Sequence, residues 1–481
     1  MPHSSSSSRN KRLFTLVAPC AMTVFLGRTL LLGFRGCGTV GATCWGSSTN
    51  GIRAQRLAQF RGGGQSENTK KIYRTLQVQV VHRHGDRSPI TPLKDEDYWA
   101  KTLIPPELLD KISSNTNVIT TPGEENTHAA HGRGPFGKLT QLGLFQLVEL
   151  GNKLREELVA PVTENEEDDE DHHLIPDPLN PQHHKIYPYP WHSQRPLQPS
   201  NIKIVSTNFP RTIQSVQGLL VGLFPDGTPG ETIDIDARHT EILIPDPQPR
   251  RTPEQIQLEA QLAKLPHLKQ RDLELQPVAV RMTAALRDSL GEGAFGVSFG
   301  VGEEKDEGNN NNNQQPVLAY TQLAEITKCL EVRNRLPPTI TKQDKDKIAT
   351  HTAWRWFEAL RHPRLIYLAM NPMVQRMVDA MHRHETEPPV IVYSAHDSTL
   401  IGLLCGFRLE PPTVWPEYGS YLKLELLQVT CLQTQSKSHV VRFSLNGNVL
   451  KSVWEDDKEE PMVEIPLELL THKIKTVGAV A

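Results

Sequence analysis

The stretch "VVHRHGDRSPI", residues 80–90, joins an apolar run directly to two imidazoles, two guanidinium groups and a carboxylate. The apolar part begins at Leu76, and a short run rich in β-branched residues predicts a buried strand. A strand that ends in charged residues either reaches solvent there or presents a polar site at the end of a sheet. The rest of the chain decides between these two interpretations.

Other apolar runs also have the length and composition of strands. "IKIVST" covers Ile202–Thr207, and "PPVIVYSA" covers Pro388–Ala395. The second of these is apolar on both faces, which is typical of a strand in the middle of a sheet. "YLKLELLQV" and "VVRFSLNGNVLKSVW" are later strand candidates, and Asn446–Gly447 predicts a hairpin turn within the second.

Apolar residues at helical spacing follow the first two strands. They predict a helix over Leu139–Leu158, with Thr140 as a candidate cap, and another over Arg211–Phe224. Strands alternating with helices predict an α/β fold in which a mostly parallel central sheet carries helices on both faces. We expect this core at residues 71–234 and 386–481, with a helical cap domain at about 235–385.

Two polar stretches interrupt the folded part, the acidic run Glu164–His173 and the asparagine-rich run Gly302–Pro316. Neither has apolar periodicity, so we expect solvated or disordered insertions. The histidine pairs in "ENEEDDEDHH" and "QHHK" have no third ligand at a defined spacing, and we predict no metal site there.

Charge and cysteine usage exclude some classes of function. The net charge of −3 over 481 residues offers no basic face for nucleic acid. Of the six cysteines, the three in the body of the chain are too widely spaced for a disulfide framework or a zinc site, although one bridge with a free thiol stays open. The six cysteines are Cys20, Cys37, Cys44, Cys329, Cys405 and Cys431.

The first 70 residues read as a targeting or anchor segment followed by a linker. No acidic residue occurs before Glu67, whereas arginines and the serine run Ser4–Ser8 do, as in a mitochondrial or other organellar presequence. The alternative is a secretory signal or a membrane anchor formed by residues 13–34. That anchor would place Arg28 inside the bilayer, at a cost of roughly 3 kcal/mol.

The polar end of the first strand has the composition of a phosphate site. Arg83 and Arg87 flank His84, and guanidinium groups fork onto phosphate oxygens. Gly85 lets the backbone approach a ligand closely. An imidazole among cations stays neutral and can attack phosphorus, while the fixed cations hold the developing charge without a metal or cofactor. The alternative, a polar strand end that faces water, is disfavoured because Arg-His-Gly-x-Arg-x-Pro rarely arises by chance after a strand.

Two more motifs follow predicted strands. In "YSAHDST", Asp397 can protonate a leaving alkoxide if its pKa is raised, and His396 can bond a phosphate oxygen. In "STNFPRT", Arg211 stands at the start of a helix, where an anion is favoured. Each motif alone is more often structural. A further Arg-His pair in "MHRHETEPP" is interpreted as an ordinary helix end.

Together, "VVHRHGDRSP", "GKLTQLGLFQLVELGNKLR", "STNFPRT" and "YSAHDSTL" resemble the histidine acid phosphatases of the phosphoglycerate-mutase-like superfamily. The resemblance implies that His84 is the phosphorylated nucleophile and Asp397 the proton donor. It also implies a phosphate-binding set of Arg83, Arg87, Arg211 and His396. The mutase branch usually has a small residue at the position of Arg87, so the acid phosphatase branch fits better.

Within the family, "VQVVHRHGDRSPITPL" and "DARHTEILIPDP" are most similar to a mitochondrial branch directed at lysophosphatidate. The chain departs from the family at Val205, where an arginine is common, and it lacks the cysteine pair that many secreted members carry near the C-terminus.

We therefore expect a metal-independent phosphomonoester hydrolase with a phosphohistidine intermediate, acting on a lysophospholipid-type or other small monoester. The contact with a membrane surface would come through the substrate or the N-terminal segment. A phytase-like or inositol polyphosphate phosphatase is one alternative, since the cap contains both basic and apolar stretches. A non-catalytic phosphate- or phospholipid-binding protein is another.

Overall fold

The computed structural model describes a set of ranges that excludes the N-terminal segment 1–70, the acidic run Glu164–His173 and most of the run Gly302–Pro316. The predictions for those stretches lie outside the described residues. The described ranges are 71–122, 133–158, 175–177, 180–187, 197–227, 230–238, 243, 252–296, 315–410, 415–454 and 461–477.

Within these residues, 11 strands form one mixed sheet, whose main path runs β10-β9-β8-β1-β7-β5-β6-β2. The half from β1 to β2 is parallel, and its strands are β1 (Lys71–Arg83), β7 (Val390–Ala395), β5 (Ile202–Ser206), β6 (Ile233–Asp236) and β2 (Thr116–Ile119). The other half is antiparallel and consists of β8 (Tyr421–Cys431), β9 (Lys437–Leu445), β10 (Asn448–Val449) and β11 (Glu464–Pro466). The start of β1 also pairs with β4 (Asn180–Tyr187), which pairs with β3 (Ile175–Asp177).

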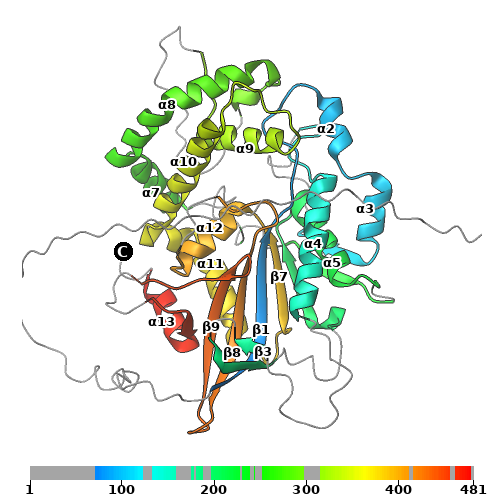
Figure 1. The fold of residues 1–481 in the computed structure, drawn as a ribbon, viewed down its shortest axis with the longest axis vertical. Helices are drawn as coiled ribbons and strands as arrows, with labels where there is room; N and C mark the ends of the chain where they lie inside the picture. The colour runs from blue at the N-terminus through cyan, green and yellow to red at the C-terminus, as the bar shows by residue number, and fades with distance from the viewer. Residues whose placement is uncertain are drawn as a thin grey trace, which may run out of the picture. The chain divides into compact units, whose positions relative to one another are not determined.

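Helices cover both faces of the sheet, as the sequence predicts (Figure 1). Successive residues of β7 alternate between two apolar clusters, because strand side chains point to opposite faces. Val390 and Val392 pack with α4 (Gln141–Leu158) and α5 (Pro210–Leu223). Ile391 and Tyr393 pack with α11 (Pro363–His382), α12 (Asp397–Gly406) and α13 (Leu467–Val477). The apolar residues on both faces of this strand are thus explained by its central position.

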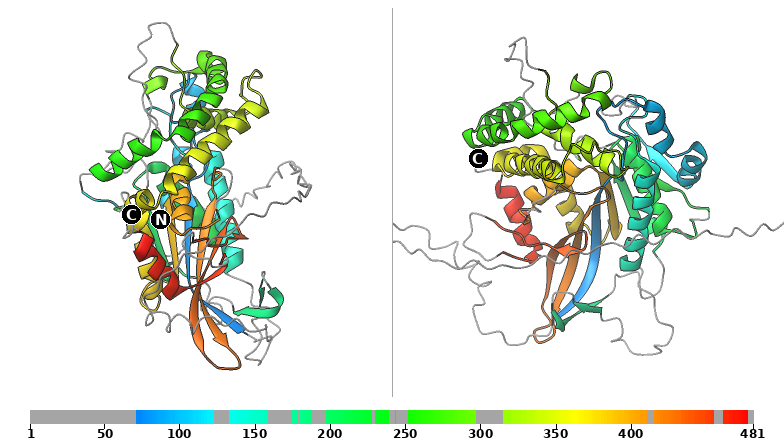
Figure 2. Two further views of the ribbon diagram at one scale, coloured as in Figure 1. Left: turned by 90° about the vertical axis from the view of Figure 1, so that its left-hand side faces the viewer. Right: turned by 45° about the horizontal axis from the view of Figure 1, so that its top comes forward.

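A third apolar cluster lies in the helical region. It joins α8 (Pro266–Leu286), α9 (Tyr320–Glu331) and α10 (Lys342–Leu360), and it takes in the buried Trp99 of α2 (Glu96–Thr102). Figures 1 and 2 place α8, α9 and α10 beyond one end of the strands. The remaining helices are α3 (Pro106–Ser113) and α7 (Pro253–Ala263).

The cap boundaries predicted from the sequence need correction at both ends. A start at residue 235 would cut β6, which pairs with β5 and β2 inside the sheet. An end at residue 385 would assign α11 to the cap, but its Met370, Met373 and Met377 are buried against the sheet face. Helical periodicity cannot distinguish a cap helix from one that covers a sheet, because both bury one apolar side.

Two local predictions are confirmed. Thr140 caps α4, since its hydroxyl oxygen accepts a hydrogen bond from Gly143 N at 3.2 Å. The hairpin between β9 and β10 turns at Asn446 and Gly447, whose φ angles are 52° and 86°, as a turn of mirror-image type requires.

Among the described residues, Cys329, Cys405 and Cys431 are free thiols. None of the helices in the described part of the chain has the length and hydropathy needed to cross a membrane.

Candidate active site

Three parallel strands bring the predicted motifs together at their carboxyl ends. β1 ends at Arg83, β5 at Ser206 and β7 at Ala395. The chain is tied across these ends, because His84 N donates to Ala395 O and Thr207 N donates to Ser394 O, each at 3.1 Å. Polar residues that follow these strands therefore share one edge of the sheet, where open α/β sheets bind their ligands.

The His84 side chain is held in a defined tautomer. Its Nδ1 lies 2.8 Å from Gly85 O, and a carbonyl oxygen only accepts, so Nδ1 carries the proton and Nε2 carries the lone pair. Burial, followed by the charges of Arg211 and Arg83, holds the pKa of His84 well below its usual value. The imidazole is therefore neutral, which agrees with the sequence-based expectation.

Asp397 is held by three donors. Its Oδ2 accepts from Arg83 Nη2 at 2.7 Å and from Trp415 Nε1 at 2.8 Å, while its Oδ1 accepts from Ser398 N at 2.8 Å. Burial opposes ionisation, but the charge of Arg83, the Trp415 hydrogen bond and the charges of Arg87 and His396 together hold the pKa of Asp397 below its usual range. A raised pKa was the condition set from the sequence, so in the ligand-free site that condition is not met.

His396 and Arg211 complete the same site. The rings of His396 and His84 meet edge to face with centroids 5.6 Å apart, and His396 Nε2 lies 3.0 Å from Thr207 Oγ1. Arg211 is buried in the first turn of α5, with its guanidinium carbon 4.6 Å from the centre of the Phe209 ring. Burial, together with the charge of Arg87, lowers the pKa of Arg211 to about 9, so it stays cationic at neutral pH.

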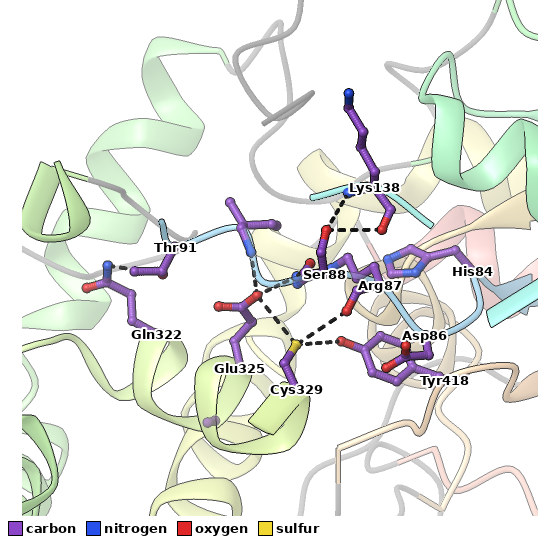
Figure 3. Close-up of polar contacts among 12 residues, drawn as sticks. His84, Asp86, Arg87, Ser88, Thr91, Lys138, Gln322, Glu325, Cys329 and Tyr418 are labelled. Carbon is purple, nitrogen blue, oxygen red and sulfur yellow. Dashed lines mark hydrogen bonds and ion pairs between the residues drawn. The ribbon is translucent and has the colours of Figure 1, made fainter. Parts of the chain in front are cut away.

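Arg87 is oriented by helix α9 (Figure 3). Its Nη1 forms an ion pair with Glu325 Oε1 and also donates to Ser88 O at 3.2 Å. Cys329, one turn further along α9, places its thiol 3.5 Å from Arg87 O and 3.8 Å from the Tyr418 hydroxyl. Burial raises the pKa of the Cys329 thiol to about 12, so this side chain packs as a neutral group.

Asp86 is a structural member of the motif. Its carboxylate is fully buried and accepts from Arg333 Nη2 and Thr140 Oγ1, each at 2.5 Å. The neighbouring Gly85 was expected to give a ligand room. In the structure its missing side chain accommodates helix α4 instead, because a Cβ at Gly85 would lie 2.1 Å from Gly143 O.

All six residues singled out from the sequence lie at this edge of the sheet. Three neighbours were not anticipated, namely Glu325, Trp415 and Tyr418. The last two stand just before β8, and this strand runs antiparallel to β1, so its start lies at the carboxyl end of β1. The apolar run in "YLKLELLQV" predicted a strand, but it did not predict the direction of that strand in the sheet or the strand beside which it lies.

Among the described residues, no group of three or more His, Cys, Asp or Glu side chains is arranged to hold a metal ion. The cations at this edge include the guanidinium groups of Arg83, Arg87 and Arg211.

Comparisons with known proteins identify several chains to which this one is similar. Bovine lysophosphatidic acid phosphatase type 6 is 25% identical over 420 residues, which cover 83% of this chain and 85% of the relative. Counting factor 60 of Dictyostelium discoideum is 25% identical over 389 residues, covering 77% and 79% of the two chains. Among solved structures, Hafnia alvei phytase superposes with a TM-score of 0.49 at 13% identity, over 84% of this chain and 97% of that one.

The sequence model of one family matches residues 76–286 and 364–446, which together make up more than half of the chain. These ranges contain all six of the site residues predicted from the sequence. The protein belongs to the histidine phosphatase superfamily, branch 2.

Proposed function

We propose that the protein hydrolyses phosphate monoesters through a phosphohistidine intermediate, without a metal ion. The observation that carries this proposal is the state of His84. Its Nδ1–H donates to Gly85 O, so the lone pair of Nε2 is available to a ligand beside Arg83, Arg87 and Arg211.

In the first step, His84 Nε2 forms a bond to phosphorus and the ester P–O bond breaks. The leaving oxygen takes a proton from Asp397, and the guanidinium groups hold the charge on the other phosphoryl oxygens. Asp397 is ionised in the ligand-free site, so it gains its proton as the substrate binds. A phosphate dianion next to Arg83 favours this, because it offsets the cation that keeps Asp397 ionised.

In the second step, a water molecule attacks the phosphohistidine. Asp397, now ionised, accepts the proton of that water while the P–N bond breaks. Inorganic phosphate and neutral His84 are the products, and Asp397 ends the cycle protonated, as it was when substrate was bound.

The substrate class we propose is a lysophospholipid-type monoester. The likeness to lysophosphatidic acid phosphatase type 6, which covers most of both chains, supports it. So does the half-buried indole ring of Trp415 beside Asp397, because an acyl chain can contact such an apolar group.

The test is hydrolysis of a chromogenic phosphomonoester by the full chain from pH 4 to 8, with a chelator present. We expect chelator-resistant activity that His84→Ala abolishes, while His384→Ala, in the second Arg-His pair, keeps it. Lysophosphatidate and phytate are then compared as substrates, and a preference for phytate would replace the lipid assignment. If the folded chain bound phosphate but hydrolysed no substrate, the proposal of an enzyme would be replaced by that of a phosphate-binding protein.

A further inference from the structure

A six-residue segment, Trp415–Ser420, contacts both α9 and the site, since Glu417 pairs with Lys328 of α9 at 2.7 Å. Arg83 Nη1 donates to Pro416 O at 2.5 Å, and the centre of the Tyr418 ring lies 4.1 Å from the guanidinium carbon of Arg83. Gly419 N donates to His84 O at 3.2 Å. The segment therefore touches both the proposed nucleophile and its neighbouring arginine.

Trp415 extends this contact to the proposed acid. Its indole Nε1 donates to Asp397 Oδ2 at 2.8 Å. The indole ring meets Trp356 of α10 edge to face, with centroids 5.5 Å apart, and Trp356 is itself buried in the apolar core. The core thus fixes the orientation of the N–H group that reaches Asp397.

The two oxygens of Asp397 differ in their partners. Oδ2 accepts from both Arg83 and Trp415, whereas Oδ1 accepts only from the backbone N of Ser398 among the described residues. The other charged or titratable groups that face this carboxyl are Arg87, Arg211 and His396. Two donors on one oxygen stabilise the charged form and leave Oδ1 as the oxygen with room for a proton.

We propose that Trp415 is a positioning residue for the proton transfers of Asp397: its indole N–H holds Oδ2, directs Oδ1 towards the ligand and sets the pH range in which Asp397 gives up its proton. This role rests on the proposed phosphatase function. It gives a reason for an aromatic residue at a position that no motif marked.

The direction of the effect follows from the hydrogen bond. Trp415→Phe keeps an aromatic ring against Trp356 but removes the donor. The carboxylate then loses one stabilising partner and binds its proton at a higher pH. A hydrogen bond to a charged group of this kind corresponds to a shift of about one pH unit.

The experiment records kcat against pH for the full chain and several variants. The limb of the profile that disappears in Asp397→Asn is assigned to Asp397. We expect Trp415→Phe and Trp415→Leu to move that limb upward by about one pH unit, and Trp415→His, which restores an N–H donor, to move it part of the way back. In the Asp397→Asn background, Trp415→Phe should have no further effect on the profile.

Trp454→Phe is the control, because Trp454 is a buried tryptophan of the apolar cluster against which Trp415 packs, and its indole nitrogen meets no partner among the described residues. Its profile should coincide with that of the unchanged chain. An active chain whose Asp397 limb stays in place in a folded Trp415→Phe or Trp415→Leu variant would overturn the role of Trp415 alone. If the unchanged chain has no phosphatase activity, the proposed function fails, and this role fails with it.

Discussion

Arg83 Nη2 lies 2.7 Å from Asp397 Oδ2, so a proposed phosphate ligand and the proposed proton donor form an ion pair in the ligand-free site. An anion that binds Arg83 competes with this carboxylate. Anion binding and protonation of Asp397 are therefore linked. Protonation removes the negative charge that repels the anion, and the bound anion offsets the Arg83 cation that keeps Asp397 ionised.

Sulfate remains a dianion from pH 7 to pH 4. It should consequently inhibit the phosphatase activity more strongly as the pH falls through this range. Asp397→Asn imitates the protonated carboxyl, so at pH 7 it should bind sulfate roughly tenfold more tightly, corresponding to about 1.4 kcal/mol. Calorimetric titration at several pH values measures both effects. Equal sulfate affinity in the variant and the unchanged chain at pH 7 would show that the ion pair does not compete.

Arg87 depends on Glu325 for its orientation. The same Oε1 atom of Glu325 also accepts from Ile90 N at 2.6 Å, so this carboxylate fixes both the arginine and the following loop. Glu325→Ala should lower kcat/KM by roughly 10- to 100-fold through misplacement of Arg87, chiefly by raising KM. Glu325→Gln, which keeps an acceptor oxygen, should lose less.

The matched control is Glu331→Ala on the same helix, where the carboxylate is exposed and pairs with Lys345. This variant should keep the steady-state constants of the unchanged chain. If Glu325→Ala also kept them, the orientation of Arg87 would have to come from its remaining contacts.

The sheet and its polar edge were predictable because the informative residues are adjacent in sequence. Arg83, His84, His396 and Asp397 stand directly after apolar runs, and a strand followed by such residues places them at a carboxyl end. Arg211 was predictable for a related reason, since it begins a helix directly after a strand. Local order is sufficient for these assignments.

Glu325 and Trp415 could not be predicted in this way. Glu325 lies 238 residues after Arg87 and belongs to an ordinary amphipathic helix, so its partner is set by tertiary packing alone. The ionised state of Asp397 was missed for the same reason, because it depends on Trp415 and on the geometry of Arg83. Sequence predicted which groups meet at the site, but not how they are paired.

The contact between Gly85 and Gly143 gives a prediction about packing. A Cβ at Gly143 would lie 2.1 Å from Asp86 O. The loop that carries His84 and Asp86 can therefore pack against α4 only when residue 143 has no side chain. Gly143→Ala should reduce stability by roughly 1–3 kcal/mol, although alanine favours helices, and should also lower kcat. Gly296→Ala is the control, because among the described residues, apart from its chain neighbours, no atom lies within 4 Å of a Cβ there. Chemical denaturation and initial rates measure the two effects, and equal stability of both variants would contradict the prediction.

Buried neutral histidines should make the fold sensitive to acid. Burial lowers the pKa of His82 from 6.5 to about 4, although its hydrogen bond to Arg83 O acts to raise it. Between these values the unfolded chain binds a proton that the folded chain does not, so the free energy of unfolding falls as the pH drops from 6.5 to about 4. His82 alone contributes a loss of about 3 kcal/mol, and His84 and His396 shift in the same direction.

Denaturant titrations at pH 7, 5.5 and 4 measure this loss. His82→Asn tests its origin, because an asparagine amide can donate to Arg83 O without titrating. From pH 6.5 to 4, the free energy of unfolding of this variant should fall less steeply than that of the unchanged chain. The two slopes differ by at most the effect of one bound proton, which is about 1.4 kcal/mol per pH unit. The same decline in both chains would place the acid sensitivity elsewhere. Added sulfate should offset part of the decline in either chain, since it binds the folded site and not the unfolded chain.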